Sequence, residues 1–325
     1  MISPTELVAV DVGGTHARFA LAEVTGRRVT ALHAEVTLHT ADHASFETAW
    51  AEFARRVGRP LPPAAAIAFA GPVLGAFLKL TNNPWVIRPA ILPEQIKVEQ
   101  LVLLNDFGAV AHAVAQLGPE HFQTLHGPSR RLPDEGVISI VGPGTGLGVA
   151  QLLRRDGRAH VIETEGGHID FAPLDPLEDR ILQHLRTRFR RVSAERLAAG
   201  TGLANIYEAL CAVERRPVVF SDDKALWAAA LDGSDALAAA TLDRFCLILG
   251  AVAGDIALAQ GAAAVVIAGG LGLRLADHLP RSGFSDRFVA KGRFEPRMRA
   301  LPVKLVTHPQ PGLFGAAAAF AERYG

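Results

Sequence analysis

The sequence has few cysteines and no excess of either charge, and these two shortages exclude several classes of protein. Only Cys211 and Cys246 occur in 325 residues, too few for a disulfide framework or a cysteine-rich zinc site. Lysine and arginine together number 33, as do aspartate and glutamate, so the formal net charge is zero. The chain therefore lacks the basic field expected of a nucleic-acid-binding protein, and it has no polybasic membrane anchor.

No stretch reads as a membrane span or as a secretory signal. The most apolar stretch, 242–259, contains Asp243, Arg244 and Asp255, which favours a buried helix. The first residues lack the charged segment that opens a signal peptide, and they run directly into an apolar strand pattern. We therefore expect a globular cytoplasmic protein with no membrane partner, long enough for two domains.

What the chain does contain is three glycine turns, each directly after an apolar run. Their residues, in chain order, are Asp11, Gly13, Gly14 and Thr15; Gly142, Gly144, Thr145, Gly146 and Gly148; and Gly269, Gly270 and Gly272. Glycine permits positive φ and close approach to a ligand, and successive N–H groups in such turns bind anions. The set predicts a nucleotide held between two parts of the chain, with ordinary hairpin turns as the structural alternative.

Two common phosphate-binding motifs do not fit these turns. A P-loop requires a lysine after its last glycine, and none follows here. The dinucleotide fingerprint requires a third glycine where Leu147 stands, and the residues after it read as a strand rather than a helix. The turns therefore indicate a nucleotide-binding fold of another kind.

The order of the apolar patterns predicts a repeated α/β unit. Strands are expected at 7–12, 18–24 and 28–36, forming an antiparallel meander, with a helix at about 45–57. From residue 137 the strand-and-turn pattern begins again. A strongly helical region follows from 176 to about 260, and the last segment forms a final helix.

Asn105 and Asp106 stand at the end of a continuous apolar strand, where open α/β sheets present groups to ligands. An aspartate there can accept the proton of an attacking sugar hydroxyl, while the amide beside it orients another hydroxyl. The alternative is that Asp106 is the N-cap of a helix beginning at Phe107. The dipeptide alone does not decide between the two interpretations.

A second polar group surrounds the glycine pair in the segment ETEGGHIDFAP. Glu165 and His168 flank the pair and can aim at one small polar ligand, although a structural histidine or a metal site are alternatives. The metal interpretation is weak because no second histidine or cysteine has a suitable spacing nearby. Glu195 stands two residues after Ser193, whereas a capping box needs three, so it keeps a possible ligand role.

The segment TNNPWVI contributes Asn82 and Asn83, whose amides are expected to face the same substrate site from a turn. Together with the groups above, these amides form a set suited to the hydroxyls of a sugar.

The chain resembles a known family in several motifs. The motifs that carry the resemblance, from one end of the chain to the other, are DVGGTHARFAL, AGPV, TNNPWVI, LLNDFGAVA, GPGTGLGVA, EGGHIDFAP, SAERLAAGTGL, GRF and HPQPGLFGAAA. As a set they resemble the bacterial glucokinases, the ATP-dependent hexokinase-like family without the cysteine-containing zinc motif. No H-x-C-G-x-x-G-C run occurs, which disfavours the zinc-containing relatives.

The resemblance implies an α/β, two-lobed, actin-like (ribonuclease H-like) sugar-kinase fold with duplicated βββαβαβα units. The small lobe would comprise 1–118, completed by a C-terminal helix at 312–325, and the large lobe 119–311. Glucose would bind between the lobes, and the γ-phosphoryl group of ATP would pass to its 6-hydroxyl in the first step of glycolysis. The family also suggests a homodimer.

The resemblance also implies roles for individual residues. Asp106 would be the general base, and the glucose contacts would be Asn105, Asp106, Glu165, His168 and Glu195. The phosphate loops would be Gly13, Gly14, Thr15, Gly144, Thr145 and Gly146, and the adenosine segment Gly269 and Gly270. Mg²⁺ would bridge the phosphates, with Asp11 as a carboxylate ligand acting through water. One departure is His16, where the family pattern has asparagine.

Two other classes of protein share parts of this pattern. A sugar-sensing transcriptional regulator would need a DNA-binding helix-turn-helix, and only six residues precede the first predicted strand. An actin-like ATPase would share the glycine turns without the Asn105–Asp106 and Glu165–His168 pairs. Among sugar kinases, the sequence leaves open mannose, fructose or an amino sugar as acceptor, and ADP or polyphosphate as donor.

Overall fold

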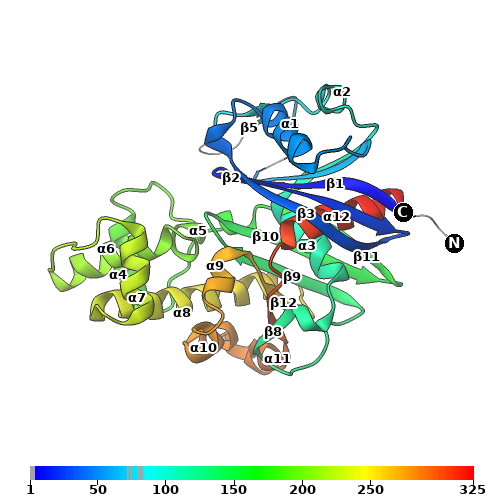
Figure 1. Ribbon diagram of the computed structural model, residues 1–325. Helices are drawn as coiled ribbons and strands as arrows, with labels where there is room; N and C mark the ends of the chain where they lie inside the picture. Colours follow the sequence, from blue (N-terminus) through cyan, green and yellow to red (C-terminus); the bar gives the residue numbers. More distant parts are fainter. Residues whose placement is uncertain (1–3, 72, 74, 80–82) are drawn as a thin grey trace. The chain divides into compact units, whose positions relative to one another are not determined.

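The computed structural model describes residues 4–71, 73, 75–79 and 83–325 (Figure 1). The chain forms two compact units. The first unit contains the residues up to Gly118 together with His308–Gly325, and the second unit contains Pro119–Thr307.

The first unit is built on a five-stranded sheet in the order β3-β2-β1-β4-β7. Its strands are β1 (Thr5–Val12), β2 (His16–Thr25), β3 (Arg28–His39), β4 (Ala64–Phe69) and β7 (Gln100–Asn105). The first three form the predicted antiparallel meander, and β4 and β7 continue the sheet in parallel with β1. A separate two-stranded sheet pairs β5 (Leu78–Lys79) with β6 (Val86–Ile87).

Both faces of this sheet are covered by apolar side chains. Successive residues of a strand point to opposite faces, and those of β1 belong alternately to two separate apolar cores. Val8 and Val10 belong to a core with Phe19 and Phe46. Leu7 and Ala9 belong to the other core, which includes α12. The helices of the unit are α1 (Phe46–Val57), α2 (Leu92–Ile96), α3 (Asp106–Gln116) and α12 (Pro311–Tyr324), the last drawn in red in Figure 1.

Local signals in the sequence explain the ends of α1. Ser45 and Thr48 form a reciprocal capping box at its start, and Gly58 ends it in the left-handed conformation with φ of +73°. The predicted helix at about 45–57 is therefore confirmed.

The second unit repeats the same strand topology. Its six-stranded sheet has the order β11-β10-β9-β12-β13-β8, so an antiparallel meander is again followed by two parallel strands. The strands are β8 (Phe122–His126), β9 (Gly136–Pro143), β10 (Leu147–Arg155), β11 (Arg158–Thr164), β12 (Ala264–Ile267) and β13 (Val303–Val306). This repetition agrees with the duplicated unit predicted from the sequence.

Helices make up most of the rest of the second unit. They are α4 (Pro176–Leu185), α5 (Glu195–Ala198), α6 (Gly202–Glu214), α7 (Asp223–Asp232), α8 (Ala236–Ala259), α9 (Gly269–Arg274), α10 (Phe284–Val289) and α11 (Glu295–Ala300). By length and composition α8 could cross a membrane, but 67% of its most apolar window is buried within the protein. It is the buried helix expected at 242–259, and Leu242, Phe245 and Leu249 lie in the core of the unit.

Candidate functional site

The first glycine turn joins β1 to β2 and is fixed by hydrogen bonds within its own backbone and from Thr40. The N–H of Gly13 donates to the carbonyl of His16 at 2.9 Å, which closes the turn. Thr40 donates its hydroxyl to the carbonyl of Gly14 at 2.8 Å and its N–H to the carbonyl of Thr15 at 3.0 Å. Among the described residues, the N–H groups of Gly14 and Thr15 have no hydrogen-bond partner. The turn thus presents two adjacent donors suited to an anion.

Asp11 lies at the end of β1, directly opposite Arg18 on β2. Arg18 Nη1 donates to Asp11 Oδ2 at 3.1 Å, and 20% of the Asp11 side chain remains exposed. Burial raises the pKa of the Asp11 carboxyl above its usual range, against the opposing effect of the Arg18 guanidinium. A partly exposed carboxylate beside an anion-binding turn fits a magnesium ligand that acts through water.

His16, the departure from the family pattern, begins β2 and pairs with His39 on β3. Their ring centroids lie 4.5 Å apart. Burial lowers the pKa of His16, and the neighbouring His39 and Arg18 lower it further. These effects favour the neutral form of the imidazole that replaces asparagine.

The second glycine turn joins β9 to β10 and has the same features as the first. Gly144 donates its N–H to the carbonyl of Gly146 at 2.8 Å, and its own carbonyl accepts from the N–H of Gly200 at 2.7 Å. Over the described part of the chain, no protein group accepts from the N–H groups of Thr145 and Gly146. The strand-like character predicted after Leu147 is confirmed by β10.

Glu195 links this turn to the predicted sugar site. It is the first residue of α5, whose N-cap Ala194 makes no side-chain capping bond. Its Oε2 accepts from the N–H of Leu147 at 2.9 Å, and a Cβ on Gly146 would approach the same oxygen to 2.6 Å. One carboxylate oxygen therefore fixes the glycine turn, and a side chain at 146 would displace the Glu195 carboxylate.

The glycine pair at 166–167 explains how Glu165 and His168 come to lie together. A Cβ on Gly167 would lie 2.0 Å from the carbonyl oxygen of Leu147, and one on Gly166 would lie 2.8 Å from Cγ1 of Val149. The pair therefore packs directly against β10 in a way that only glycine allows. Glu165 Oε2 and His168 Nε2 are 3.9 Å apart, and both side chains are more than half exposed.

Asn105 ends β7 and caps α3. Its Oδ1 accepts from the N–H groups of Phe107 and Gly108 at 2.8 and 3.2 Å, and its amide donates to the carbonyl of Gly71 at 3.1 Å. The alternative in which Asp106 is the N-cap is wrong, because the helix already begins at Asp106 and Asn105 caps it. Asp106 instead occupies the first helical position, with its Oδ1 accepting from the N–H of Phe107 at 2.9 Å.

Asn83 contacts the first glycine turn. Its amide nitrogen donates to the carbonyl of Gly14 at 3.4 Å, and its Oδ1 accepts from the N–H of Trp85 at 2.7 Å. Asn82, also predicted as a substrate contact, lies outside the described residues.

The third glycine segment differs from the first two. The sequence predicts a turn, but α9 begins at Gly269, with one residue between it and the end of β12. Gly269 has φ of +84°, and a Cβ there would lie 2.8 Å from the carbonyl oxygen of Pro143, at the end of β9. The close packing of backbone on backbone explains this glycine, and its predicted adenosine contact stays a prediction.

The predicted site residues thus fall into two sets. Asp11, Asn83, Asn105 and Asp106 belong to the first unit with the first turn, while Glu165, His168 and Glu195 belong to the second unit with the second turn. Among the described residues, no group of three or more His, Cys, Asp or Glu side chains could hold a metal ion.

Sequence reasoning missed Thr40 and Arg18. Counting the register of the predicted meander could have found Arg18, since it faces Asp11 across the turn. No local signal marks Thr40.

The chain is similar to known proteins over nearly its whole length. A family model described as Glucokinase matches residues 7–323. The glucokinase of Zymomonas mobilis subsp. mobilis is 64% identical over 319 residues, covering 98% of each chain. The glucokinase of Caulobacter vibrioides is 40% identical over 316 residues, covering 95% of this chain and 93% of that one.

Solved structures confirm the predicted fold class. The glucokinase from an Antarctic psychrotroph, 32% identical, has a TM-score of 0.85 and covers 98% of this chain and 99% of that chain. A ROK family glucokinase from Streptomyces griseus, in complex with glucose and AMPPNP, is 21% identical with a TM-score of 0.62, covering 98% and 99%. The fold is therefore the two-lobed, actin-like sugar-kinase fold, and the chain belongs to the glucokinase family.

Proposed function

We propose that this chain transfers the γ-phosphoryl group of ATP to the 6-hydroxyl of D-glucose, giving glucose 6-phosphate and ADP. The observation that carries the proposal is the pair of glycine turns, each with two adjacent N–H groups that no described residue engages. Two such donor pairs suit the phosphates of a nucleotide, because successive N–H groups bind anions. The glucokinases to which the chain is similar support glucose as the acceptor.

Asp106 is proposed as the general base for the sugar hydroxyl. Transition states of phosphoryl transfer are loose, so the protein mainly positions the reactants and stabilises charge. An aspartate can accept the proton without a raised pKa if the proton leaves late in the reaction. The capping bonds of Asn105 and its bond to Gly71 hold the backbone beside Asp106 in one conformation.

The other predicted polar residues are proposed to bind the remaining sugar hydroxyls. These are Asn82, Asn83, Asn105, Glu165, His168 and Glu195. A site built to hydrogen-bond hydroxyls discriminates against sugars that lack or misplace them, because its own polar groups are then left unpaired. The proposal requires groups of both units to act on the same pair of substrates.

Mg²⁺ is proposed to accompany ATP, where it neutralises phosphate charge. Asp11 is the residue of this chain suited to hold it, through water, because its carboxylate is partly exposed beside the first turn. Gly269 and Gly270 are proposed to lie against the adenosine. We further propose, on the family resemblance, a cytoplasmic homodimer, which sedimentation of the purified protein would test.

An activity matrix of donors against sugars tests the proposal directly. ATP, ADP and polyphosphate are each combined with glucose, mannose, fructose and glucosamine, and the phosphorylated sugar is measured. We expect the highest kcat/KM for ATP with glucose. A higher value for another donor or another sugar would overturn the assignment of that substrate.

A further inference from the structure

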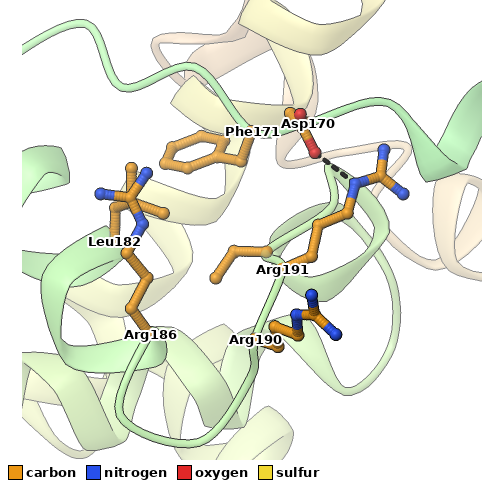
Figure 2. A pocket seen from close by; sticks show the side chains of 7 residues that line it. Asp170, Phe171, Leu182, Arg186, Arg190 and Arg191 are labelled. Carbon is orange, nitrogen blue, oxygen red and sulfur yellow. Dashed lines mark hydrogen bonds and ion pairs between the residues drawn. The ribbon is translucent and has the colours of Figure 1, made fainter.

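A cavity of about 230 Å³ lies in the second unit, apart from the glycine turns (Figure 2). The side chains of Phe171, Leu182 and Val192, which are themselves buried, line part of a cavity surface that is mainly polar. Arginines from the segment that follows α4 line the rest. Figure 2 shows Arg186 on one side of the cavity, with Arg190 and Arg191 on the other.

The turn after α4 fixes the backbone at Arg186. The carbonyl of Leu185 accepts from the N–H groups of Arg188 and Phe189 at 3.0 and 2.9 Å, and that of His184 accepts from Thr187 at 3.1 Å. The carbonyls at the end of α4 are therefore occupied by the turn itself. The backbone from 186 to 189 is fixed by hydrogen bonds, and the Arg191 side chain is held by Asp170.

The charge around the cavity is unbalanced. Arg191 Nε donates to Asp170 Oδ1 at 2.5 Å, the dashed contact of Figure 2. Within the described residues, the guanidinium groups of Arg186 and Arg190 make no hydrogen bond or ion pair, and Asp170 is the one carboxylate that lines the cavity. Two positive charges, both on exposed side chains, thus have no protein partner among the described residues.

We propose that this cavity binds a small phosphate monoester. A phosphate dianion matches the two unpaired charges, and the forked donors of arginine fit phosphate oxygens. The edges of Phe171, Leu182 and Val192 that line the cavity would contact the organic part of the ligand. None of the residues that line this cavity belongs to the glycine turns that are proposed to bind the phosphates of ATP.

The cavity is connected to the proposed sugar contacts, so its occupation has a consequence. Arg191 also donates to the carbonyl of His168 at 2.5 Å. Asp170 pairs with Ser193 in an isolated antiparallel bridge, and Ala194 donates to the carbonyl of Ile169 at 2.8 Å. The residues just before Glu195 are thus joined to the segment that follows His168.

A bound anion competes with Asp170 and with the carbonyl of His168 for the Arg191 guanidinium. The segment that carries His168 then loses a donor, and glucose binding weakens. This coupling rests on the proposed function, whereas binding of the anion does not.

Calorimetry of the full chain, saturated with a non-hydrolysable ATP analogue, measures binding without any turnover. The probes are glycerol 3-phosphate, inorganic phosphate and, as a neutral control, glycerol. The variant combines Arg186→Gln with Arg190→Gln, and the matched control is Arg180→Gln, an exposed arginine on α4 outside the cavity.

We expect glycerol 3-phosphate to bind wild type and the control with Kd on the order of 0.1–1 mM. The double variant should bind about tenfold more weakly, as expected for the loss of charge-assisted hydrogen bonds. Tighter binding of inorganic phosphate than of the monoester would overturn the assignment of an organic ligand. Equal binding by the double variant and wild type, or no binding by wild type, would overturn the site.

The coupling is measured separately as the KM for glucose with and without glycerol 3-phosphate. We expect a rise of about fivefold in wild type and in the control, and none in the double variant. An unchanged KM in wild type overturns the coupling. If the chain phosphorylated no sugar at all, the proposed function would fail while the calorimetric result still stood.

Discussion

Glu195 connects the second glycine turn with the predicted sugar site, and two substitutions separate these roles. Its Oε2 accepts from the N–H of Leu147 at 2.9 Å, and Leu147 is only 4% exposed. Glu195→Ala leaves that N–H without its acceptor, at a cost of about 1–3 kcal/mol. Glu195→Gln keeps an amide oxygen that can accept the same bond, so it should cost less than about 1 kcal/mol.

Steady-state kinetics and thermal unfolding of the two variants then give different patterns. In Glu195→Ala we expect a lower melting temperature and a higher KM for both ATP and glucose, because the turn and the sugar contact are both affected. In Glu195→Gln we expect a higher KM for glucose with little change in the KM for ATP, because the amide preserves the turn. Loss of a charged hydrogen bond to the sugar predicts a change of about tenfold or more in kcat/KM for glucose.

Two results would refute this reasoning. If Glu195→Ala left the KM for ATP and the melting temperature unchanged, the carboxylate would not be what holds the turn. If Glu195→Gln bound glucose as wild type does, the predicted sugar contact of this residue would be wrong.

Three further predictions concern the stability of the fold. Gly167→Ala should destabilise the protein by about 3 kcal/mol or more in denaturant titrations, because its Cβ would lie 2.0 Å from the Leu147 carbonyl oxygen; a loss below about 1 kcal/mol would contradict the packing. Burial lowers the pKa of His112 to about 4 from the ordinary 6.5. As the pH falls, His112 is therefore protonated in the unfolded chain before it is protonated in the folded protein. The free energy of unfolding should fall as the pH drops from 6.5 to 4. That loss is at most about 3 kcal/mol and should be absent in His112→Gln. Arg244→Ala should cost about 2 kcal/mol, because Nη1 of Arg244 donates to the buried Glu178 carboxylate at 3.0 Å while Arg287 still donates to the same oxygen; an unfolding free energy equal to that of wild type would contradict this.

The sequence predicted the parts of the site that depend on local patterns. The meander, the Gly13–Gly14 turn and the position of Asn105 at a strand end all follow from apolar periodicity and glycine placement over short stretches. The capping of α3 was harder, since Asn105 and Asp106 are both good N-cap residues and the helix boundary decides between them.

The contacts that hold the turns could not be predicted in this way. Thr40 reaches Gly14 across 26 positions, and Glu195 reaches Leu147 across 48. Such bonds depend on how strands and loops fold back on one another, and no local pattern encodes that. The third glycine segment was mispredicted for a different reason. A glycine pair after a strand suits a helix start as well as a turn, so the local pattern does not distinguish them. Gly269 is explained instead by its close packing against the Pro143 backbone, which the local sequence does not reveal.

The most direct test of the account compares wild type with Asp106→Asn in an assay for glucose 6-phosphate, with ATP and glucose as substrates. Asparagine keeps the shape of the side chain but cannot accept the hydroxyl proton. We predict that kcat falls by about 10²–10⁴-fold, while the Kd for glucose, measured by calorimetry, changes much less. Near-normal turnover in Asp106→Asn would contradict the assignment of the base, and absence of glucose 6-phosphate from wild type would contradict the proposed reaction itself.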